Sequence, residues 1–571
     1  MQFSFVNVTG PKKTRREAHL ELAEIRSHNT RLIHQRRRKQ TQETRSVSRG
    51  KAQSTYSAQS PRTTTSPEAE PRSPEPAEGL IALQQIPASK HDPLQHLSGS
   101  SDPFDAFGNI QVTPEMNSLL GFMRHEYLPC IFITPMALKL CGQKSYTSQM
   151  IEQELVPGAP LIKREFYRAM VNPKNAPGWI ASRIPIVFSM LPQSSCEQFE
   201  NVAAQVRLQS FKQLREDLAL QEQTGTSDIS LVIQIVHMFK SGLMENQPDS
   251  ARVHAWALRR IGDIVSDDPY LALDLFCTLM YTDADYAISN MRYTLLDYDH
   301  WLNQQLEPYW QRIEVALPDI GNAYEEVDES VGFPKVRGAL VRLRRTLAIA
   351  NMGIDMTVQE NQARVVYIYR WAANRTHHDS AQLNDHYHNM MASIPTADPE
   401  EETTRHGEAA LTLATLYCIR KYMHTAIYRG VDIRDVSHVI IPRLRDAIAK
   451  TLLTASLPQP WQYQKALFWA LYCGAHYEES LRRGLAKPCD PPTDGWFGQM
   501  LVTVATQMNV LRWNDAQEHL EKIVYSDLLA PTGAEWFEQL MTPVVPSELV
   551  QGRRIDLSWQ EPYTVRRKAG E

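Results

Sequence analysis

Apolar side chains recur every three or four residues along most of the chain, from about residue 104 to residue 546. This is the spacing of side chains that share one face of an α-helix. The pattern therefore predicts an all-α body, an irregular multi-helix domain. The clearest stripes are Phe199, Val202 and Val206; Val253, Ala257, Ile261 and Ile264; Phe497, Leu501, Val504, Met508 and Leu511; and Ala516, Leu520 and Ile523.

Signals for strands are nearly absent, whereas signals for helix starts are frequent. Only residues 365–368 fit a short strand, and they fit a helix equally well. Ser194 and Glu197 have the spacing of a capping box, in which a hydroxyl and a carboxylate three residues apart satisfy backbone N–H groups at a helix start. Pro269 is predicted to begin a further helix, because proline is favoured in the first turn.

Both ends of the chain differ in composition from the body. Residues 1–51 are basic, with apolar residues at helical spacing. Residues 52–101 are rich in Ser, Thr and Pro, and they bury too little apolar surface to offset the entropy of ordering. We therefore expect a basic N-terminal arm (1–51), a disordered linker (52–101), a helical domain (102–546) and a polar C-terminal tail (547–571).

The composition fits a globular protein and argues against several classes. Of the 571 residues, 43% are hydrophobic and 22% are charged, and no apolar run has the length of a membrane helix. The N-terminus lacks the charged lead and apolar core of a secretory signal. The 7 cysteines are scattered without a Cys-x-x-Cys pair, which indicates a reducing compartment and no disulfide framework or cysteine-rich zinc module.

The net charge of −5 conceals two regions of opposite charge. Residues 1–51 contain 13 Lys and Arg against four Asp and Glu, a charge of +9, and the remainder contains 47 against 61, a charge of −14. A basic arm on an acidic body predicts a polyanionic partner or a targeting signal. The candidate contact residues form two clusters, Lys12, Lys13, Arg15 and Arg16, and Arg36, Arg37, Arg38 and Lys39.

Such short basic runs have two common functions. They serve as nuclear-import signals, read by the import machinery, or as phosphate contacts on DNA. Each neutralised phosphate adds affinity that depends on salt and not on base sequence. A solvated basic helix or a docking segment is the alternative for this arm. The arm therefore predicts a nuclear location more directly than it predicts DNA binding.

Motifs that carry catalysis or bind phosphate are missing. The sequence has no Gly-x-Gly-x-x-Gly, Gly-x-x-x-x-Gly-Lys, Gly-x-Ser-x-Gly or His-Glu-x-x-His. Residues 376–388 form the densest cluster of His and Asp, whose side chains are candidate ligands of a divalent metal. Because His378 and His386 lack regular helical spacing, a solvated loop is the favoured interpretation. No catalytic, cofactor-binding or metal residue is assigned, and no cofactor is expected.

Three other features have a chemical and a structural interpretation. Asp283 and Asp285 have the residue types of an acid–base pair, but a helix-surface or capping position is favoured. The basic run at residues 335–345 predicts an amphipathic helix with a solvated basic face. Cys418 and Cys473 lie among apolar residues and are predicted to be small core residues.

A set of landmarks over most of the chain occurs in a characteristic order. They are residues 5–11, 25–28, 102–107, 254–258 and 281–287, the Trp469-containing run 467–475, and then Trp496, Trp513 and Trp536. Together they resemble the fungal-specific transcription-factor domain, a helical regulatory module often found behind a binuclear zinc cluster. The resemblance implies nuclear localisation and regulation of transcription, often of a metabolic or secondary-metabolite pathway.

Two features depart from that family. The zinc cluster needs six closely spaced cysteines to fold its DNA-reading helix, and the first cysteine of this chain is Cys130. Residues 265–269 also stand where the family has an Arg-Gly-Gly-type turn. The resemblance therefore supports a regulatory function better than direct DNA binding, and it transfers no catalytic residue.

Three functional hypotheses follow. The leading one is a nuclear transcription regulator, not an enzyme, whose helical domain binds protein partners while its arm gives import and DNA contact. The first alternative is a nuclear scaffold or co-regulator without DNA affinity. The second alternative is an all-α metal-dependent enzyme that uses the histidine cluster.

Overall fold

The structure is a computed structural model that describes residues 113–542, except 144, 157, 225–228, 262–268, 316, 356–357, 395–396, 428–434, 455–462, 528 and 531. The chain divides into two units, Met1–Gly79 and Leu80–Glu571. All described residues belong to the second unit. The basic arm, the linker and the tail lie outside the described residues, so their boundaries stay predictions.

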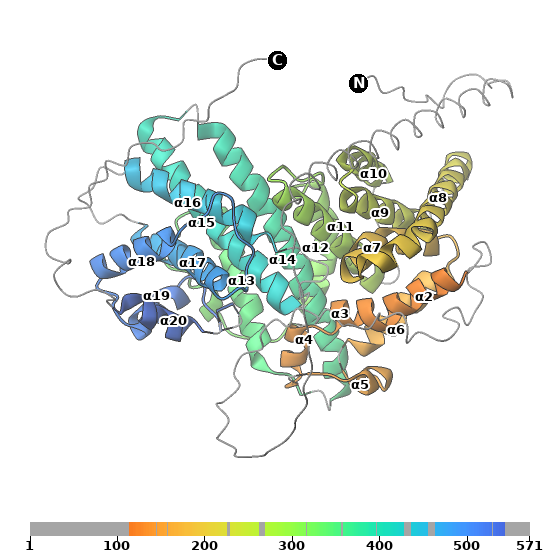
Figure 1. The fold of residues 1–571 in the computed structure, drawn as a ribbon, viewed down its shortest axis with the longest axis horizontal. Coiled ribbons are helices and arrows are strands. Elements are labelled where there is room, and N and C mark those ends of the chain that lie inside the picture. Colours follow the sequence, from red (N-terminus) through yellow and green to blue (C-terminus); the bar gives the residue numbers. More distant parts are fainter. Residues whose placement is uncertain are drawn as a thin grey trace, which may run out of the picture. The chain divides into compact units, whose positions relative to one another are not determined.

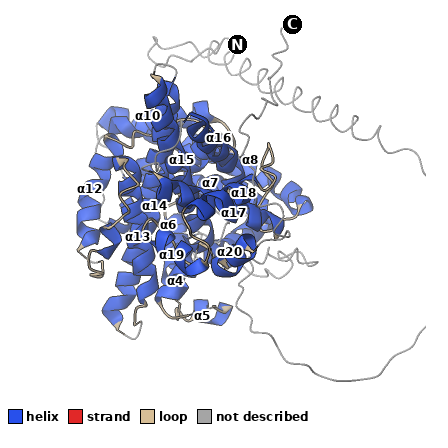
Figure 2. Cartoon of the chain, turned by 90° about the vertical axis from the view of Figure 1, so that its left-hand side faces the viewer, coloured by secondary structure: helices blue, strands red, loops and turns tan. Residues whose placement is uncertain are grey.

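The described residues form helices and no strand, which confirms the all-α prediction (Figure 2). No described helix is both long enough and apolar enough to cross a membrane. Residues 365–368 belong to a helix. The elements are α2 (Pro114–Phe122), η2 (Met123–Tyr127), α3 (Leu128–Phe132), α4 (Pro135–Leu140), α5 (Ser148–Glu152), α6 (Ala159–Val171), α7 (Ala176–Met190), α8 (Gln193–Thr224), α9 (Ile229–Met244), α10 (Pro248–Ile261), α11 (Pro269–Ser289), α12 (Trp301–Glu314), η3 (Ala323–Glu325), α13 (Pro334–Met352), α14 (Gln359–Ser393), α15 (Pro399–Tyr422), η5 (Met423–Ile427), α16 (Ser437–Thr454), α17 (Gln464–Arg482), α18 (Trp496–Gln507), α19 (Trp513–Glu521) and α20 (Gly533–Met541).

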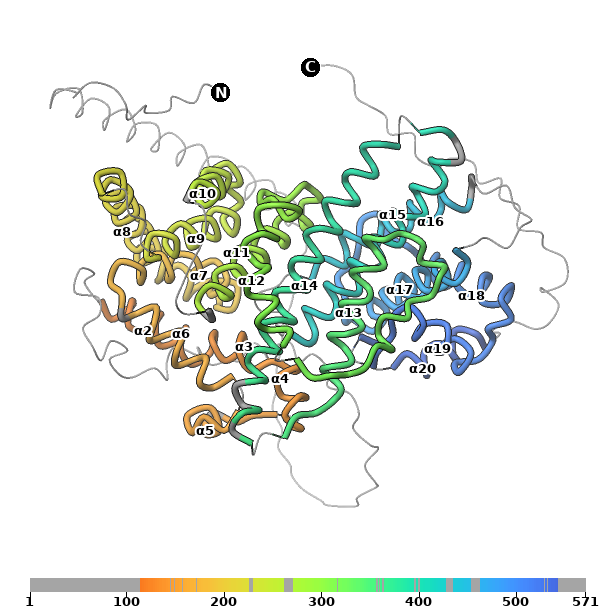
Figure 3. Tube along the Cα trace, turned by 180° about the vertical axis from the view of Figure 1, so that it is seen from behind, coloured from red at the N-terminus to blue at the C-terminus, as the bar shows by residue number. Residues whose placement is uncertain are grey.

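The long helices α11, α14 and α15 run through the middle of this unit (Figure 1). α11 packs against α14, α14 packs against α15, and α15 also contacts α16 and α17. The group α7 to α10 lies on the α11 side, and the group α17 to α20 lies on the α15 side (Figure 3). The three central helices therefore connect two outer helix groups.

Several helices begin where a capping side chain precedes a proline. The Thr134 hydroxyl accepts a hydrogen bond from the Ala137 N–H at 3.2 Å, and the Asp398 carboxylate accepts one from the Glu401 N–H at 2.8 Å. In both cases the next residue is proline. The first N–H groups of a helix have no backbone acceptor, and proline has no N–H that needs one. Local sequence alone fixes these two helix starts.

The predicted stripe of α18 is confirmed over its first half. Phe497, Leu501 and Val504 are buried. The helix ends at Gln507, and Leu511 beyond it is 47% exposed. The stripe of α19 is confirmed in full, since Ala516, Leu520 and Ile523 are buried.

The stripe of α8 is confirmed, since Phe199, Val202 and Val206 are buried. The capping box of α8 and the stripe of α10 need correction. Ser194 lies within the first turn of α8 and not at its cap, because the helix begins one residue earlier. On α10, Val253 is 56% exposed, whereas Ala251, Ala255 and Leu258 are buried. The predicted stripe begins at Val253, which is larger than the alanines. The neighbouring helix α9 packs against α10, and small residues such as Ala251 allow the close approach. The prediction that Pro269 begins a helix is confirmed.

The contact between α17 and α18 depends on a glycine. A Cβ atom on Gly474 would lie 2.1 Å from Cδ1 of Phe497, so only glycine allows this approach. Trp469, on the same helix, is 1% exposed, which confirms that the run 467–475 forms a buried helix. One edge of this helix lines the pocket described next.

Candidate functional site

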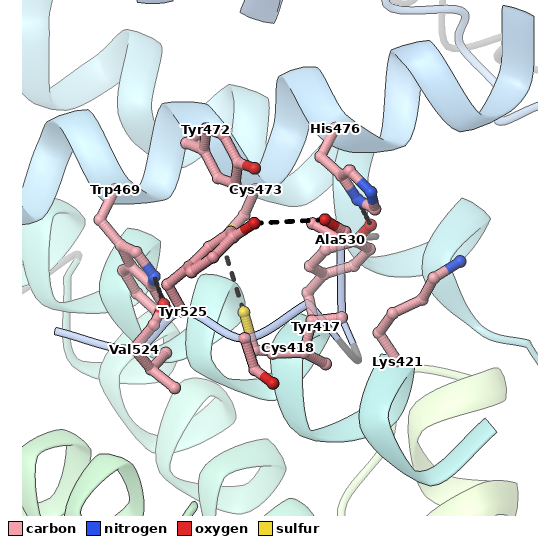
Figure 4. A pocket seen from close by; sticks show the side chains of 12 residues that line it. Tyr417, Cys418, Lys421, Trp469, Tyr472, Cys473, His476, Val524, Tyr525 and Ala530 are labelled. Carbon is pink, nitrogen blue, oxygen red and sulfur yellow. Dashed lines mark hydrogen bonds between the residues drawn. The ribbon is translucent and has the colours of Figure 1, made fainter. Parts of the chain in front are cut away.

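A small pocket lies between α15, α17 and the segment that follows α19 (Figure 4). Its cavity volume is about 30 Å³, which corresponds to roughly two water-sized groups. The side chains from α15 and α17 point toward the segment across the pocket. The lining residues are Tyr417, Cys418, Lys421, Trp469, Tyr472, Cys473, His476, Val524, Tyr525, Ser526, Leu529 and Ala530.

Helical spacing brings the lining residues of α17 together. Trp469, Cys473 and His476 are separated by four and three residues, so they project from one face of the helix. Tyr417 and Lys421, four residues apart, do the same on α15. The pocket is therefore built from two helix faces that the apolar pattern already placed in the core.

Hydrogen bonds hold the third wall against these helices. The Trp469 indole N–H donates to the Val524 carbonyl at 3.0 Å, and the Tyr525 hydroxyl donates to the Ala530 carbonyl at 3.3 Å. The Tyr525 hydroxyl has one proton, and it shares this proton with the Asp527 carboxylate, 2.9 Å away. These bonds hold residues 524–527 and 529–530 in place without regular secondary structure.

Two thiols meet at the base of the pocket. The Sγ atoms of Cys418 and Cys473 lie 3.4 Å apart, and both residues are buried. Burial, together with the neighbouring Cys418 thiol, raises the pKa of Cys473 well above its usual value. Cys473 is therefore a protonated thiol at neutral pH, which is a poor nucleophile and a poor metal ligand. The prediction that both cysteines are core residues is confirmed.

The other titratable groups of the pocket are also driven toward their neutral forms. Burial lowers the pKa of His476 to about 3 and lowers that of Lys421. Burial also raises the pKa of Tyr417 and Tyr472 well above the usual value. A general acid or base works best with a pKa near the operating pH. These shifts suit the pocket to contacts with aromatic and neutral polar groups rather than to proton transfer.

The histidine cluster is not a solvated loop, so that interpretation is wrong. Residues 376–388 lie within α14, and His377, His378 and Asp379 are at most 3% exposed. The His378 ring contacts the rings of Tyr298 and Trp310, at centroid distances of 5.6 and 5.1 Å. Long-range packing against α12 and the preceding loop makes these polar residues part of the core. Among the described residues, no group of three or more His, Cys, Asp or Glu side chains is arranged to hold a metal ion.

The two aspartates of α11 are buried, so the helix-surface interpretation is also wrong. Asp283 accepts hydrogen bonds from the backbone N–H groups of Leu295 and Leu296, at 2.9 Å each. Burial raises the pKa of Asp283 to about 7. Asp285 instead forms an ion pair with Arg420 on α15. The two carboxylates have separate partners and do not form an acid–base pair.

The basic run at residues 335–345 is helical as predicted, but its arginines are not free in solvent. Arg342 pairs with Asp379 of α14 at 2.7 Å. Arg344 donates to the carbonyls of Ala323 and Ile523, at 3.0 and 3.3 Å. These side chains tie α13 to its neighbours, so the basic run stabilises the fold.

The candidate contact residues of the arm, from Lys12 to Lys39, lie outside the described residues. Within the body, sequence reasoning missed the pocket. The helical spacing of Trp469, Cys473 and His476 was a usable signal, but nothing in the sequence marks Tyr525 as their neighbour. No protein-family model matches the chain, and no match was found among the curated proteins or the solved structures. The resemblance to the fungal transcription-factor domain stays a prediction.

The buried histidines predict acid sensitivity, which His378→Phe tests. Burial, with Arg342 and Arg375 nearby, lowers the pKa of His378 from 6.5 to about 3. Between these values the unfolded chain binds a proton that the folded chain does not, so stability falls as pH drops below 6.5. This one group contributes about 1.4 kcal/mol per pH unit. We expect His378→Phe to lose less stability than the unsubstituted protein between pH 7 and pH 5, measured by urea unfolding.

The matched control is His300→Phe, because His300 has a side chain that is 88% exposed. We expect the loss of stability between pH 7 and pH 5 to be smaller in His378→Phe than in His300→Phe. Equal loss of stability in His378→Phe and in the unsubstituted protein would show that His378 is protonated in the folded state.

Proposed function

We propose that this protein is a nuclear regulator of transcription whose helical domain binds protein partners and whose basic arm gives nuclear import. The observation that carries the proposal is the division of charge, +9 in residues 1–51 and −14 in the remainder. A concentrated positive charge favours a polyanion or an import receptor as the partner of the arm. A pathway-specific role in metabolic or secondary-metabolite regulation rests on the family resemblance alone.

The described part of the chain supports binding rather than catalysis. In the pocket between α15 and α17, the pKa values of His476, Tyr417 and Tyr472 are moved away from neutrality, so these three side chains are inefficient proton donors or acceptors. We therefore propose that the protein is not an enzyme and needs no cofactor. Trp469 and Trp536 are buried, and Trp496 and Trp513 pack partly buried against the same core, as packing residues of a regulatory domain would.

One observation favours the co-regulator alternative. Residues 1–129 contain no cysteine, so this part of the chain does not supply the ligands with which a zinc cluster would present a DNA-reading helix. A co-regulator would reach DNA through a second protein and would use the arm for import alone. Import and DNA binding therefore need separate tests.

Nuclear import is tested with the full chain fused to a fluorescent reporter. We expect the fusion to accumulate in nuclei, and we expect alanine at all eight positions of the two basic clusters to make it diffuse, because import receptors bind clustered positive charge. The control replaces exposed basic residues of the helical body. Nuclear accumulation of the eightfold variant would contradict the role of the arm. The control positions are Lys163, Lys212, Arg252 and Lys522.

Direct DNA contact is tested by the salt dependence of binding to duplex DNA. Each neutralised phosphate contributes about −0.9 to the slope of log K against log salt concentration. We expect a steep slope for the full chain and a shallower one when Arg36, Arg37, Arg38 and Lys39 are alanine. Binding that is undetectable at low salt, with import intact, would reject direct contact and leave the co-regulator alternative.

A further inference from the structure

The long helix α8 has large apolar side chains on the face that points away from the core. It packs against α2, α7 and α9, and it lies at the outer edge of its helix group (Figures 1 and 3). Val202 and Val206 are buried on its inner face. On the outer face, Leu208, Phe211 and Leu218 are 72%, 52% and 37% exposed. A cluster of exposed apolar side chains, unlike a single one, is characteristic of a docking surface.

The exposed side chains recur at the spacing of a coiled coil. The outer face contains a stripe of six exposed positions whose separations alternate between four and three residues. These are the separations of the a and d positions, through which one helix packs along another. The stripe extends roughly 27 Å along the helix axis. We call it the α8 seam, and its members are Ala204, Leu208, Phe211, Arg215, Leu218 and Glu222.

The two charged members of the seam, Arg215 and Glu222, are unpaired within the part of the chain that the structure describes. Neither side chain forms an ion pair or a hydrogen bond with another described residue, and no described aromatic ring lies against the Arg215 guanidinium. The neighbouring Lys212 and Glu216 instead pair with each other, at an N–O distance of 3.9 Å. Arg215 and Glu222 are therefore available to a second helix.

The order of side chains along the seam fits a second copy of α8 in antiparallel orientation. When the first residue of one seam lies opposite the last residue of the other, Leu208 lies opposite Leu218 of the second copy. In the same alignment Phe211 lies opposite Arg215 of the second copy, where a guanidinium and an aromatic ring attract each other. The two-fold axis repeats each contact, because such an interface uses the same surface of both copies.

Charge favours the antiparallel orientation over the parallel one. In a parallel pair each member of the seam would meet its own copy, so Arg215 would face Arg215 and Glu222 would face Glu222. Like charges opposite each other oppose association. The antiparallel pair instead places Glu222 beside Ala204, whose small side chain leaves the carboxylate in contact with water. The seam thus supplies its own complement, which makes a second copy the partner that it fits.

We propose that the α8 seam is a self-association surface, on which α8 of a second copy of this chain packs in antiparallel orientation. A standard protein interface buries about 800 Å² on each partner. A pair of helices over this length buries less, so we expect a dimer that dissociates in the micromolar range. The inference goes beyond the regulatory function proposed above and does not depend on it.

Self-association of the full-length protein is measured by sedimentation velocity over a range of micromolar concentrations. We expect a reversible shift from monomer to dimer as the concentration rises. Leu208→Glu places a charge opposite Leu218, and Phe211→Lys places a second cation opposite Arg215. Each should weaken the dimer at least tenfold, whereas Leu485→Glu, at an exposed leucine beyond α17, should associate like the unsubstituted protein. Circular dichroism identifies a variant that fails to fold, in which case the other variant decides.

A monomer at every concentration would overturn the proposal, and it is the result expected if a different protein or another part of this chain covers the seam. Unchanged association in a folded Leu208→Glu or Phe211→Lys variant would also overturn it, because the dimer would then form through another surface.

The orientation is tested by crosslinking single-cysteine additions with a short bismaleimide. Ala204→Cys and Glu222→Cys lie opposite each other only in the antiparallel pair. We expect a mixture of the two variants to give more covalent dimer than either variant alone, with the unsubstituted protein as the background for the native cysteines. Stronger crosslinking of Ala204→Cys with itself than with Glu222→Cys would show a parallel pair and overturn the proposal.

Discussion

The ion pair between Asp285 on α11 and Arg420 on α15 lies almost fully inside the helical body. Their side chains are 3% and 2% exposed, and Oδ1 and Nη2 are 2.5 Å apart. Each of these charges alone would cost several kcal/mol to bury, so each is tolerated only while its partner is in place. The relative position of α11 and α15 is therefore fixed by electrostatics as well as by apolar packing.

The same constraint acts on the helices next to this pair. Arg342 of α13 pairs with the buried Asp379 of α14, and Arg370 of α14 pairs with Asp274 of α11. The four helices α11, α13, α14 and α15 are thus linked by three ion pairs. The pocket between α15 and α17 lies on the α15 side of this framework.

Sequence reasoning succeeded where the signal was local and apolar. The stripes of α18 and α19 and the helix around Trp469 were visible because large apolar side chains recur at helical spacing. It failed for α10, where small alanines face α9 and Val253 faces solvent. A periodic pattern of large residues does not show which face receives a close neighbour.

Sequence reasoning also failed where polar residues are buried by distant partners. Asp285 and Arg420 are 135 residues apart, so neither position signals that the other will neutralise it. The irregular spacing of the histidines favours a loop for His378, whereas its ring neighbours, Tyr298 and Trp310, lie far away in the sequence and bury it within a helix. The pocket between α15 and α17 also depends on residues distant in the sequence, because its lining comes from three separate segments. No linear motif can describe such a site.

The claim that buried ion pairs hold the central helices is tested most directly by a double-mutant cycle on Asp285 and Arg420. Unfolding free energies would be compared for Asp285→Ala, Arg420→Met and the double variant. We expect each single substitution to cost about 3–5 kcal/mol, because it leaves one buried charge unneutralised, and the double variant to cost much less than their sum. Additive losses would contradict the account, because they would show that the two side chains stabilise the fold independently.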